Sequence, residues 1–562
     1  MTEDRLARDR ECIVDASQRG TVARLRAYTR LSGPGWLQGA ITLGGGSLAG
    51  SLYLGILTGF SLLWLQVFAM LMGVTMLAAI AWVTLSTGKR PFQAINDHIN
   101  PVLGWGWAIA TLLANMVWCL PQFNLGVAAV QQNLLPAMEG TAGKVGTCAV
   151  LLATATTVIW FYDTGARGIR IFEILLKIIV AIIVISFFGV IVTMTFKGGL
   201  DWGAILSGYV PDLSLLWSPA ATFDPHIEAV APQYQSFWVE RILADQRDVM
   251  VTAVATAVGI NMTFLLPYSM LAKGWTREFR GLAVFDLSTG LLIPFVLATS
   301  CVVIASASAF HAQPDESLIE GREGVPAKIV GQYEKLLDAR IEAEHGAGAL
   351  TEEDGIGLRA AASTADKKMA SMLVRRDSFH LADSLSPLLG SGFSQTIFGI
   401  GVLGMALSTI IILMLISGFV VCEMLGVEAR GRTRRLACLL PAVGVLGPFV
   451  WSGDAKFWLA VPTSVFGAVL LPIAYLTFVF MMNHRGLLGA AMPRGPRRLG
   501  LNMLMLLALT LAGVGAGWVI WSKAHWYGVG AVLAFVSLAV VVHFVRPPLP
   551  VPSRDTDPVS ES

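Results

Sequence analysis

Long apolar segments recur along the whole chain and restrict its fold more than any other feature. A membrane helix needs roughly 20 consecutive apolar residues to cross a bilayer. Segments of this kind occur at 36–59, 62–86, 104–134, 146–162, 171–196, 249–272, 281–310, 393–425, 434–451, 456–482, 500–521 and 526–545. The sequence therefore predicts an all-α polytopic membrane protein with about 12 transmembrane helices, in contact with the lipid bilayer.

The composition fits this class and excludes several others. Hydrophobic residues make up 55% of the chain and charged residues only 14%, as expected for a protein embedded in lipid. The formal net charge of +2 gives no reason to expect a nucleic-acid partner. The sequence has no H-E-x-x-H, P-loop or nucleophile elbow. We therefore expect a protein that is not an enzyme and that needs no cofactor.

Basic residues in the short loops gather on one side of the membrane. Lys and Arg are enriched in loops that face the cytoplasm. With a cytoplasmic N-terminus, the short outer loops hold Lys144, Lys456 and Lys523. The inner loops hold Lys89, Arg90, Arg167, Arg170, Lys273, Arg277, Arg280, Arg430, Arg432, Arg434, Arg435, Arg485, Arg494, Arg497 and Arg498. We therefore expect a multi-pass protein of the plasma (inner) membrane with both termini in the cytoplasm.

The first and sixth apolar segments are interrupted near their middles. The first contains "LGGGSLAG" (43–50), in which each glycine costs about 1 kcal/mol of helix stability relative to alanine. The sixth contains Pro267, which leaves the carbonyl of Thr263 without its helical partner. Irregular backbone at membrane depth is tolerated only where protein or a water-filled cavity surrounds it. Two breaks five helices apart predict an inverted repeat of five plus five helices, with a binding site where the breaks meet.

The segments and loops divide the chain into parts. The expected parts are a cytoplasmic N-terminal segment (1–30), a first five-helix repeat (31–196), an extracytoplasmic connection (197–248), a second five-helix repeat (249–490) with an extracytoplasmic helical insertion (311–392), two additional transmembrane helices (491–545) and a disordered cytoplasmic tail (546–562). Proline and polar residues dominate the tail, which is why we expect it to be disordered.

Several stretches, in this order, resemble one known family. They are "GPGWLQGAITLGGGS", "STGKRPFQAI", "ARGIRIFE", "LLPYS", "GVLGMALSTIIILMLISGFVVCEML", "TRRLACLLPA" and "LLPIAYLTFVFMMNHRGLLG". Together they resemble the NRAMP family of divalent-metal transporters over most of residues 31–490. The resemblance implies a LeuT-type fold, a 5+5 inverted repeat with discontinuous first and sixth helices, and secondary active transport by alternating access.

The chain departs from this family at the residues that would bind the metal. The D-P-G-N motif is matched by Gly44, Gly45, Gly46 and Ser47, and the M-P-H motif by Leu266, Pro267 and Tyr268. The family's aspartate, asparagine and methionine ligands are thereby lost, so we expect no side-chain metal ligand there, only backbone carbonyls. The predicted substrate site is Ile41, Gly44, Gly45, Gly46, Ser47, Thr263, Leu266 and Tyr268.

The resemblance also implies changes along the transport pathway. An acidic residue of the third helix, a glutamine of the eighth and the second histidine of the sixth correspond to Asn124, Ser408 and Lys273. Other intramembrane acidic residues are expected to have structural partners. The expected pairs are Glu173 with Lys177 at i+4, Glu423 with Arg430, and Asp286 with Arg277 or Arg280.

Three functions remain open at this point. The family likeness implies transport of a metal ion. The lost carboxylate and the glycine N–H groups at a helix break instead favour a small organic or anionic solute. A non-transporting membrane sensor could read a ligand through residues 311–392, although it would not need two broken helices. We expect an NRAMP-like secondary transporter, for which the family implies metal-ion transport although the usual metal ligands are absent. The alternatives are the same scaffold transporting a small organic or anionic solute, or a non-transporting membrane sensor.

Overall fold

The chain forms a bundle of long helices in a computed structural model. The structure describes residues 3–162, 166–322, 325, 327–345, 352–376, 380–382, 390–450 and 456–546. Every regular element in this part of the chain is helical, so the prediction of an all-α membrane protein is confirmed. Residues 547–562 of the tail that we expect to be disordered lie outside the described residues.

The first five spans follow the predicted order. They comprise the helix pair α3 (Pro34–Thr42) and α4 (Gly45–Thr58), then α5 (Leu63–Thr87), α7 (Pro101–Ala128) with its continuation η1 (Ala129–Leu134), α8 (Thr141–Tyr162) and α9 (Ala166–Phe196). The chain bends by 52° between α3 and α4. The first span is therefore discontinuous, as the glycine run predicts.

Local sequence signals explain where these helices begin and end. The Asn100 side chain accepts a hydrogen bond from the N–H of Val102 at 2.8 Å, and Pro101 follows at the first helical position of α7. Proline suits this position because its missing N–H would have no partner there. Gly88 ends α5 in the left-handed conformation with φ of 65°, which glycine adopts without strain.

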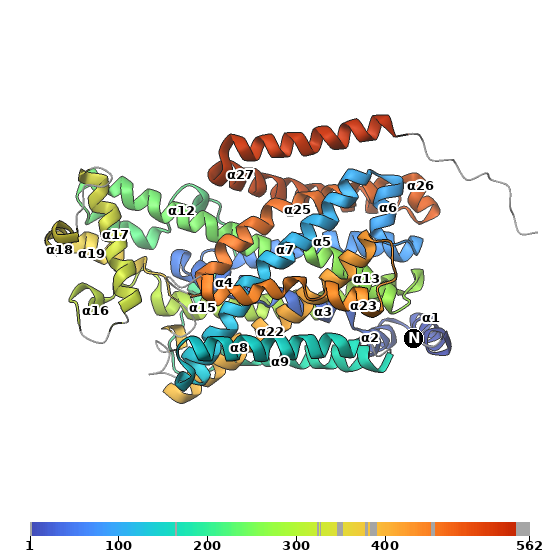
Figure 1. The fold of residues 1–562 in the computed structure, drawn as a ribbon, viewed down its shortest axis with the longest axis horizontal. Helices are drawn as coiled ribbons and strands as arrows, with labels where there is room; N and C mark the ends of the chain where they lie inside the picture. The colour runs from blue at the N-terminus through green and yellow to red at the C-terminus, as the bar shows by residue number, and fades with distance from the viewer. Residues whose placement is uncertain are drawn as a thin grey trace, which may run out of the picture.

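The second five spans contain the other discontinuous helix. They comprise α12 (Pro232–Ala257) with α13 (Ile260–Ala272), α14 (Arg280–Leu287) with η6 (Ser288–Leu292) and α15 (Ile293–Phe310), α22 (Ser391–Met424), the short elements α23 (Gly431–Ala437), η7 (Leu440–Leu446) and α24 (Gly447–Val450), and η8 (Lys456–Leu459) with α25 (Ala460–Asn483). Figure 1 shows these helices interleaved with those of the first five spans in one bundle.

The number of spans agrees with the prediction. The described residues form ten helices that are long and apolar enough to cross a membrane, or eleven spans when α3 and α4 are counted as one. The last of these helices, α27 (Gly495–Val545), contains a non-helical residue at His525 with φ of 45°. Because this kink divides α27 into two membrane-length pieces, the total becomes twelve.

The sixth span is broken at a different place from the one predicted. We expected the break at Pro267, but the chain is extended at Val258 and Gly259, and Pro267 lies inside α13. A Cβ at Gly259 would collide with the indole of Trp118, so close packing requires a glycine there. A proline inside a helix removes a single backbone hydrogen bond, whereas two extended residues interrupt the helix completely.

The shorter helices gather at the two ends of the bundle. At one end are α16 (Glu316–Ile319), α17 (Ala327–His345), α18 (Glu352–Ala361) and α19 (Thr364–Met372), near the start of α12 (Figure 1). At the other end are α1 (Glu3–Gln18), α2 (Thr21–Leu31), α6 (Pro91–His98) and α26 (Arg485–Leu488). The remaining short elements are η2 (Pro136–Met138), α10 (Trp202–Ser207), η3 (Ser214–Leu216), η4 (Ala221–Phe223), α11 (Asp224–Glu228), η5 (Arg277–Phe279) and η9 (Gly489–Ala491).

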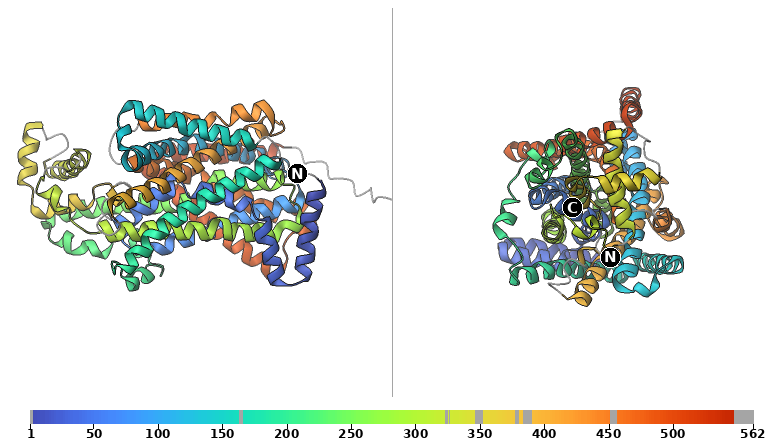
Figure 2. Two further views of the ribbon diagram at one scale, coloured as in Figure 1. Left: turned by 90° about the horizontal axis from the view of Figure 1, so that it is seen from below. Right: turned by 90° about the vertical axis from the view of Figure 1, so that its left-hand side faces the viewer.

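Burial distinguishes the centre of the bundle from its rim. In the most apolar stretch of α22, 89% of the residues are buried, whereas in that of α27 the share is 0%. In the end-on view of Figure 2 the C-terminal helices, coloured red, lie at the edge of the bundle. Because α27 is apolar and exposed, it faces lipid, and the inner helices α4, α12 and α22 surround the middle of the molecule.

Candidate functional site

The breaks in the first and sixth spans border one small cavity. Leu43 and Gly44 separate α3 from α4, and Val258 and Gly259 separate α12 from α13. Parts of α7, α22 and α25 complete the walls, and the cavity has a volume of about 40 Å³. The polar side chains that line it are those of Thr42, Ser47, Gln122, Thr256, Asn261, Thr409, Thr463 and Ser464.

The glycine run at the first break is required by close packing. A Cβ on Gly44 would overlap the hydroxyl of Thr409, and a Cβ on Gly45 would overlap the side chain of Leu125. A Cβ on Gly46 would lie 2.7 Å from the Cγ2 of Thr256. The three glycines therefore let helices α7, α12 and α22 approach the backbone at the cavity wall.

Hydrogen bonds tie the two breaks together. The Thr42 hydroxyl, at the end of α3, lies 2.9 Å from the carbonyl oxygen of Thr256 and 2.8 Å from that of Ala257, at the end of α12. The Ser47 hydroxyl donates back to the carbonyl of Thr42 across the break. These contacts hold the carbonyl ends of α3 and α12 side by side at the cavity.

The N-terminal ends of α4 and α13 are partly satisfied by amide side chains. Gln122 Oε1 accepts a hydrogen bond from the Gly45 N–H at 2.9 Å, and Asn261 Oδ1 accepts one from the Met262 N–H at 2.8 Å. Such N–H groups are the usual anchors for a bound anion. At these two positions the N–H group already donates a hydrogen bond to a neutral oxygen of the protein.

The cavity has no formal charge. Its lining includes hydroxyls, two amides and the Met262 thioether, but no Asp, Glu, His, Lys or Arg side chain. Within the described part of the chain, no group of three His, Cys, Asp or Glu side chains could hold a metal ion. The atoms of the cavity lining that could bind a metal ion are therefore neutral oxygens and one sulfur.

Four of the predicted site residues border the cavity. Ile41, Gly44, Gly46 and Ser47 line it, and Gly45 contacts it through its hydrogen bond to Gln122. The Thr409 hydroxyl lies 3.4 Å from the Ile41 carbonyl oxygen. The Ile41 carbonyl faces the cavity because α3 ends at Thr42, before a residue four positions later can donate to this carbonyl within the helix.

Three predicted site residues lie away from the cavity, since the sixth span breaks earlier than expected. Thr263 Oγ1 accepts a hydrogen bond from Trp107 Nε1 at 2.9 Å. Leu266 is buried in the core, and Tyr268 stacks on Phe264 with ring centroids 4.4 Å apart. The break at Gly259 places all three farther along α13, outside the lining of the cavity.

Two predicted pathway residues also lie outside the lining. Asn124 is buried on α7, and the Ser408 hydroxyl donates to the Met405 carbonyl at 3.2 Å. Their close neighbours Gln122 and Thr409 line the cavity instead.

Several lining residues are not among the site residues that the sequence predicts. They are Thr42, Trp118, Gln122, Thr256, Gly259, Asn261, Met262, Thr409, Thr463 and Ser464. Met262 is the most informative of these because it supplies a thioether to the cavity lining. The methionine of the M-P-H motif corresponds to Leu266, which has no thioether. A signal for it exists in the sequence, since Met262 lies four residues before Leu266 and such residues share a helix face.

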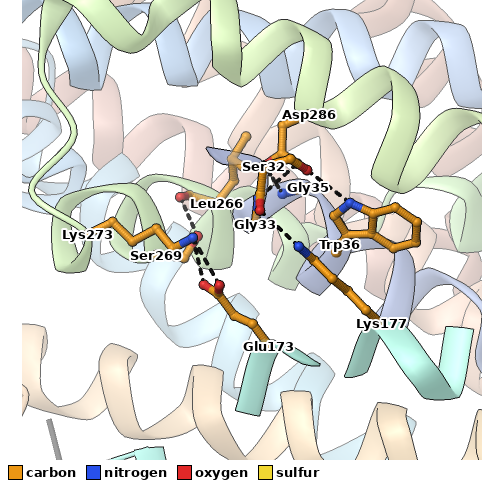
Figure 3. A network of polar contacts seen from close by, with 10 residues as sticks. All are labelled: Ser32, Gly33, Gly35, Trp36, Glu173, Lys177, Leu266, Ser269, Lys273 and Asp286. Carbon is orange, nitrogen blue, oxygen red and sulfur yellow. Dashed lines mark hydrogen bonds and ion pairs between the residues drawn. The ribbon is translucent and has the colours of Figure 1, made fainter. Parts of the chain in front are cut away.

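A second polar cluster surrounds the N-terminal end of α3. We call it the α3 clamp; it consists of Ser32, Gly33 and Gly35 with Glu173, Lys177, Lys273 and Asp286 (Figure 3). Lys273 Nζ lies 2.8 Å from a Glu173 carboxylate oxygen, and Lys177 Nζ donates to the Ser32 carbonyl at 2.9 Å. The expected pair of Glu173 with Lys177 was therefore wrong: each contacts a partner on another helix or segment.

Asp286 binds the start of α3 rather than an arginine. Its carboxylate accepts hydrogen bonds from the Ser32 hydroxyl at 2.5 Å, the Gly33 N–H at 3.1 Å and the Gly35 N–H at 2.6 Å. Free N–H groups at a helix start carry partial positive charge, which a carboxylate neutralises. The predicted contact with Arg277 or Arg280 was wrong because Asp286 is buried and faces α3.

Glu423 also has a different partner from the one predicted. Its carboxylate lies 3.1 Å from Arg90, which precedes α6, and not beside Arg430. The Tyr268 hydroxyl lies close to the same carboxylate. This contact connects α13 to the end of α22 and to the loop before α6.

The fold and the paired breaks define a multi-pass membrane protein of the LeuT type. The structure is similar to crystal structures of the Eremococcus coleocola manganese transporter. A mutant form matches with a TM-score of 0.62 at 14% identity over 92% of this chain and 95% of the other. A complex with an aromatic bis-isothiourea substituted compound matches with a TM-score of 0.63 at 14% identity and the same coverage.

The family follows from the sequence match. The model of the natural resistance-associated macrophage protein-like family matches residues 35–323 and 357–521, and the chain belongs to this family. The metal transporter Nramp2 of Oryza sativa subsp. japonica is 27% identical over 165 residues, 29% of this chain and 30% of that protein. Nramp2 of Populus trichocarpa is 27% identical over 159 residues, 28% of each chain. These alignments span less than a third of the relatives' length.

Proposed function

We propose that this protein is a secondary transporter that carries a metal cation across the membrane by alternating access. The single observation that carries the proposal is the cavity between the two broken helices, where the carbonyl ends of α3 and α12 meet. Membership of the family supports a metal ion as the substrate, and so does the likeness to proteins named as metal and manganese transporters.

The size of the cavity favours an ion over an organic solute. A cavity needs a volume of roughly 10–15 Å³, measured in the same way, to hold one water molecule. The volume of about 40 Å³ therefore accommodates an ion with a few retained waters. Small-molecule sites are typically about ten times larger, which favours an ion over an amino acid or a similar solute in this conformation.

The polarity of the cavity favours a cation over an anion. The C-terminal ends of α3 and α12 direct partial negative charge toward it. The opposing N–H groups of Gly45 and Met262 already donate to Gln122 and Asn261. Neutral oxygens suit hard cations, and without a carboxylate the cation keeps part of its hydration shell. We therefore propose a hydrated, oxygen-binding cation such as Mn²⁺ or Mg²⁺.

We also propose that both termini face the cytoplasm of the cell in the plasma membrane. The support is the distribution of charge: arginines and lysines concentrate near α1, α2, α23 and α26, at the end opposite to α16–α19. Cytoplasmic loops carry such an excess of basic residues. In this orientation the α3 clamp faces the cytoplasm, and residues 311–392 lie outside.

Uptake into proteoliposomes tests the proposed site. Gly46→Ala adds a methyl group 2.7 Å from the Cγ2 of Thr256 and 3.1 Å from the Oγ of Ser464, so it closes part of the cavity. We expect uptake of Mn²⁺ and Mg²⁺ to fall by at least about tenfold, equivalent to 1.4 kcal/mol of lost binding.

The matched control is Gly517→Ala on α27, where an added Cβ meets no atom within 4 Å. It should transport like the wild type. Saturable wild-type uptake that Gly46→Ala leaves unchanged would exclude the cavity as the site. No cation uptake by the wild type would contradict the proposed function itself.

A further inference from the structure

The α3 clamp contains a carboxylate whose partner is a flexible side chain. Glu173 comes from the beginning of α9, and Lys273 follows the last residue of α13; both side chains are about 15% exposed, at 14% and 16%. Their ion pair lies against Gly33, because a Cβ at Gly33 would meet the Lys273 ammonium and both Glu173 carboxylate oxygens. The pair therefore joins three segments, α9, α13 and the start of α3 (Figure 3).

We propose that Glu173 is a second binding site for the transported cation, which the Lys273 ammonium occupies in this conformation. This inference rests on the proposed function, since it concerns the same substrate on its way out of the cavity. The chemistry is complementary: the cavity offers neutral donors, whereas Glu173 offers the carboxylate that a hard cation prefers.

The position of Glu173 fits a site on the release pathway. Gly33 and Thr42 are separated by nine residues along α3, roughly 13 Å at 1.5 Å per residue. A cation that leaves the cavity along α3 toward its N-terminal end passes the helices packed against α3, which include α9 and α13. These are the segments that the Glu173–Lys273 pair holds together, so the pair must separate before the cation can pass.

Separation leaves a carboxylate without a counter-ion in a partly buried place, which costs free energy. The passing cation is the positive charge available to replace the ammonium. Cation and lysine would then alternate at one carboxylate, and the return of Lys273 would displace the cation toward bulk water. The Lys273 ammonium thus takes the place of the cation at Glu173 whenever no cation is bound there.

The other charged groups of the clamp do not offer the same site. Asp286 already accepts hydrogen bonds from Ser32, Gly33 and Gly35, and it holds the start of α3 in place. Lys177 donates to the Ser32 carbonyl rather than to Glu173. The exchangeable pair is therefore Glu173 with Lys273.

Counting bound Mn²⁺ on the purified full-length protein tests this inference. The free ion is measured by electron paramagnetic resonance. Lys273→Met removes the ammonium and keeps the carboxylate, so we expect one additional Mn²⁺ per chain relative to Glu173→Gln/Lys273→Met. Its affinity should be at least about tenfold higher than any residual binding in that double variant, because a carboxylate contact is charge-assisted.

Two further variants make the result decisive. Lys177→Met is the matched control, since it removes a neighbouring ammonium that does not contact Glu173 and should add no Mn²⁺ site. Lys177→Met/Lys273→Met removes the lysine that could move into the vacated place four residues away, and it should bind the additional Mn²⁺ as well.

The inference is overturned if neither Lys273→Met nor Lys177→Met/Lys273→Met binds more Mn²⁺ than Glu173→Gln/Lys273→Met. This outcome would leave the ion pair with a purely structural role. The readout does not depend on the cavity. Failure of wild-type uptake would contradict the proposed function, whereas failure to gain a site in the lysine variants would contradict only the role of Glu173.

Discussion

The cavity and the α3 clamp lie on the same helix, α3, but they use opposite chemistry. At the C-terminal end of α3 the protein gathers hydroxyls, amides and carbonyls without a formal charge. At the N-terminal end it gathers two carboxylates and two ammonium groups. The first arrangement can hold an ion weakly, while the second holds the helix itself. The comparison teaches that the charged side chains around α3 contact its N-terminal end, whereas the cavity at its other end is lined by neutral groups.

A charged ligand in the cavity would bind a cation tightly but would also slow its release. Neutral donors avoid that cost because the ion keeps part of its own water. The charged interactions lie instead in the clamp, where they hold the start of α3 in place.

The largest expected effect concerns Asp286 and the position of α3. Asp286→Ala removes the acceptor of three hydrogen bonds at the start of α3. Each buried donor left without a partner costs about 1–3 kcal/mol, so we expect a loss of at least about 3 kcal/mol in folding free energy. The measurement is the thermal unfolding midpoint of the purified protein in detergent.

Two graded variants serve as controls for Asp286. Asp286→Asn keeps one acceptor oxygen and should lose less stability, and Ser32→Ala should lose the least because it removes one of the three donors. An unfolding midpoint of Asp286→Ala equal to that of the wild type would contradict the clamp as the element that positions α3.

A smaller effect is expected in the cavity, and it should appear in binding rather than in stability. Thr409→Val removes the hydroxyl that lies 3.4 Å from the Ile41 carbonyl and keeps the shape of the side chain. The loss of one neutral contact should weaken the apparent affinity for Mn²⁺ by about two- to tenfold. The measurement is the concentration dependence of uptake into proteoliposomes.

The adjacent residue gives a matched control for Thr409. Ser408 has the same kind of hydroxyl, but it donates to Met405 and does not line the cavity. Ser408→Ala should therefore leave the apparent affinity within about twofold of the wild type. If Ser408→Ala weakened it more than Thr409→Val, the lining of the cavity would be assigned incorrectly.

The sequence predicts the architecture well because the bilayer imposes simple rules. Apolar length determines the spans, and glycines at 44–46 mark the first break through their low helix propensity. The second break is harder to predict. Pro267 is the stronger local signal, whereas Gly259 packs against the Trp118 indole of another helix, a contact that leaves no trace in the local pattern.

The sequence predicts only part of the candidate site, because packing between distant segments determines the rest. Residues at the first break, such as Ile41 and Ser47, are contiguous with the signal that identifies them. Thr409 and Ser464 come from spans far away in the sequence, and only packing brings them to the cavity. Ion pairs show the same limitation: Glu173 has a lysine at i+4, yet it pairs with Lys273, which is 100 residues away.

The central claim is that the neutral cavity binds a cation, and one substitution tests it most directly. Asn261→Asp retains an oxygen that accepts from the Met262 N–H and adds one negative charge to the cavity. Asn100→Asp is the matched control, because the Asn100 side chain also accepts a hydrogen bond from a backbone N–H near the start of a helix and does not line the cavity.

The measurement is the affinity of the two variants and the wild type for Mn²⁺. For Asn261→Asp we expect an increase of about tenfold or more, since an added carboxylate attracts a cation strongly in a partly buried site. Asn100→Asp should leave the affinity unchanged. Unchanged or weaker Mn²⁺ binding by Asn261→Asp would contradict the account and would favour an anionic or organic substrate.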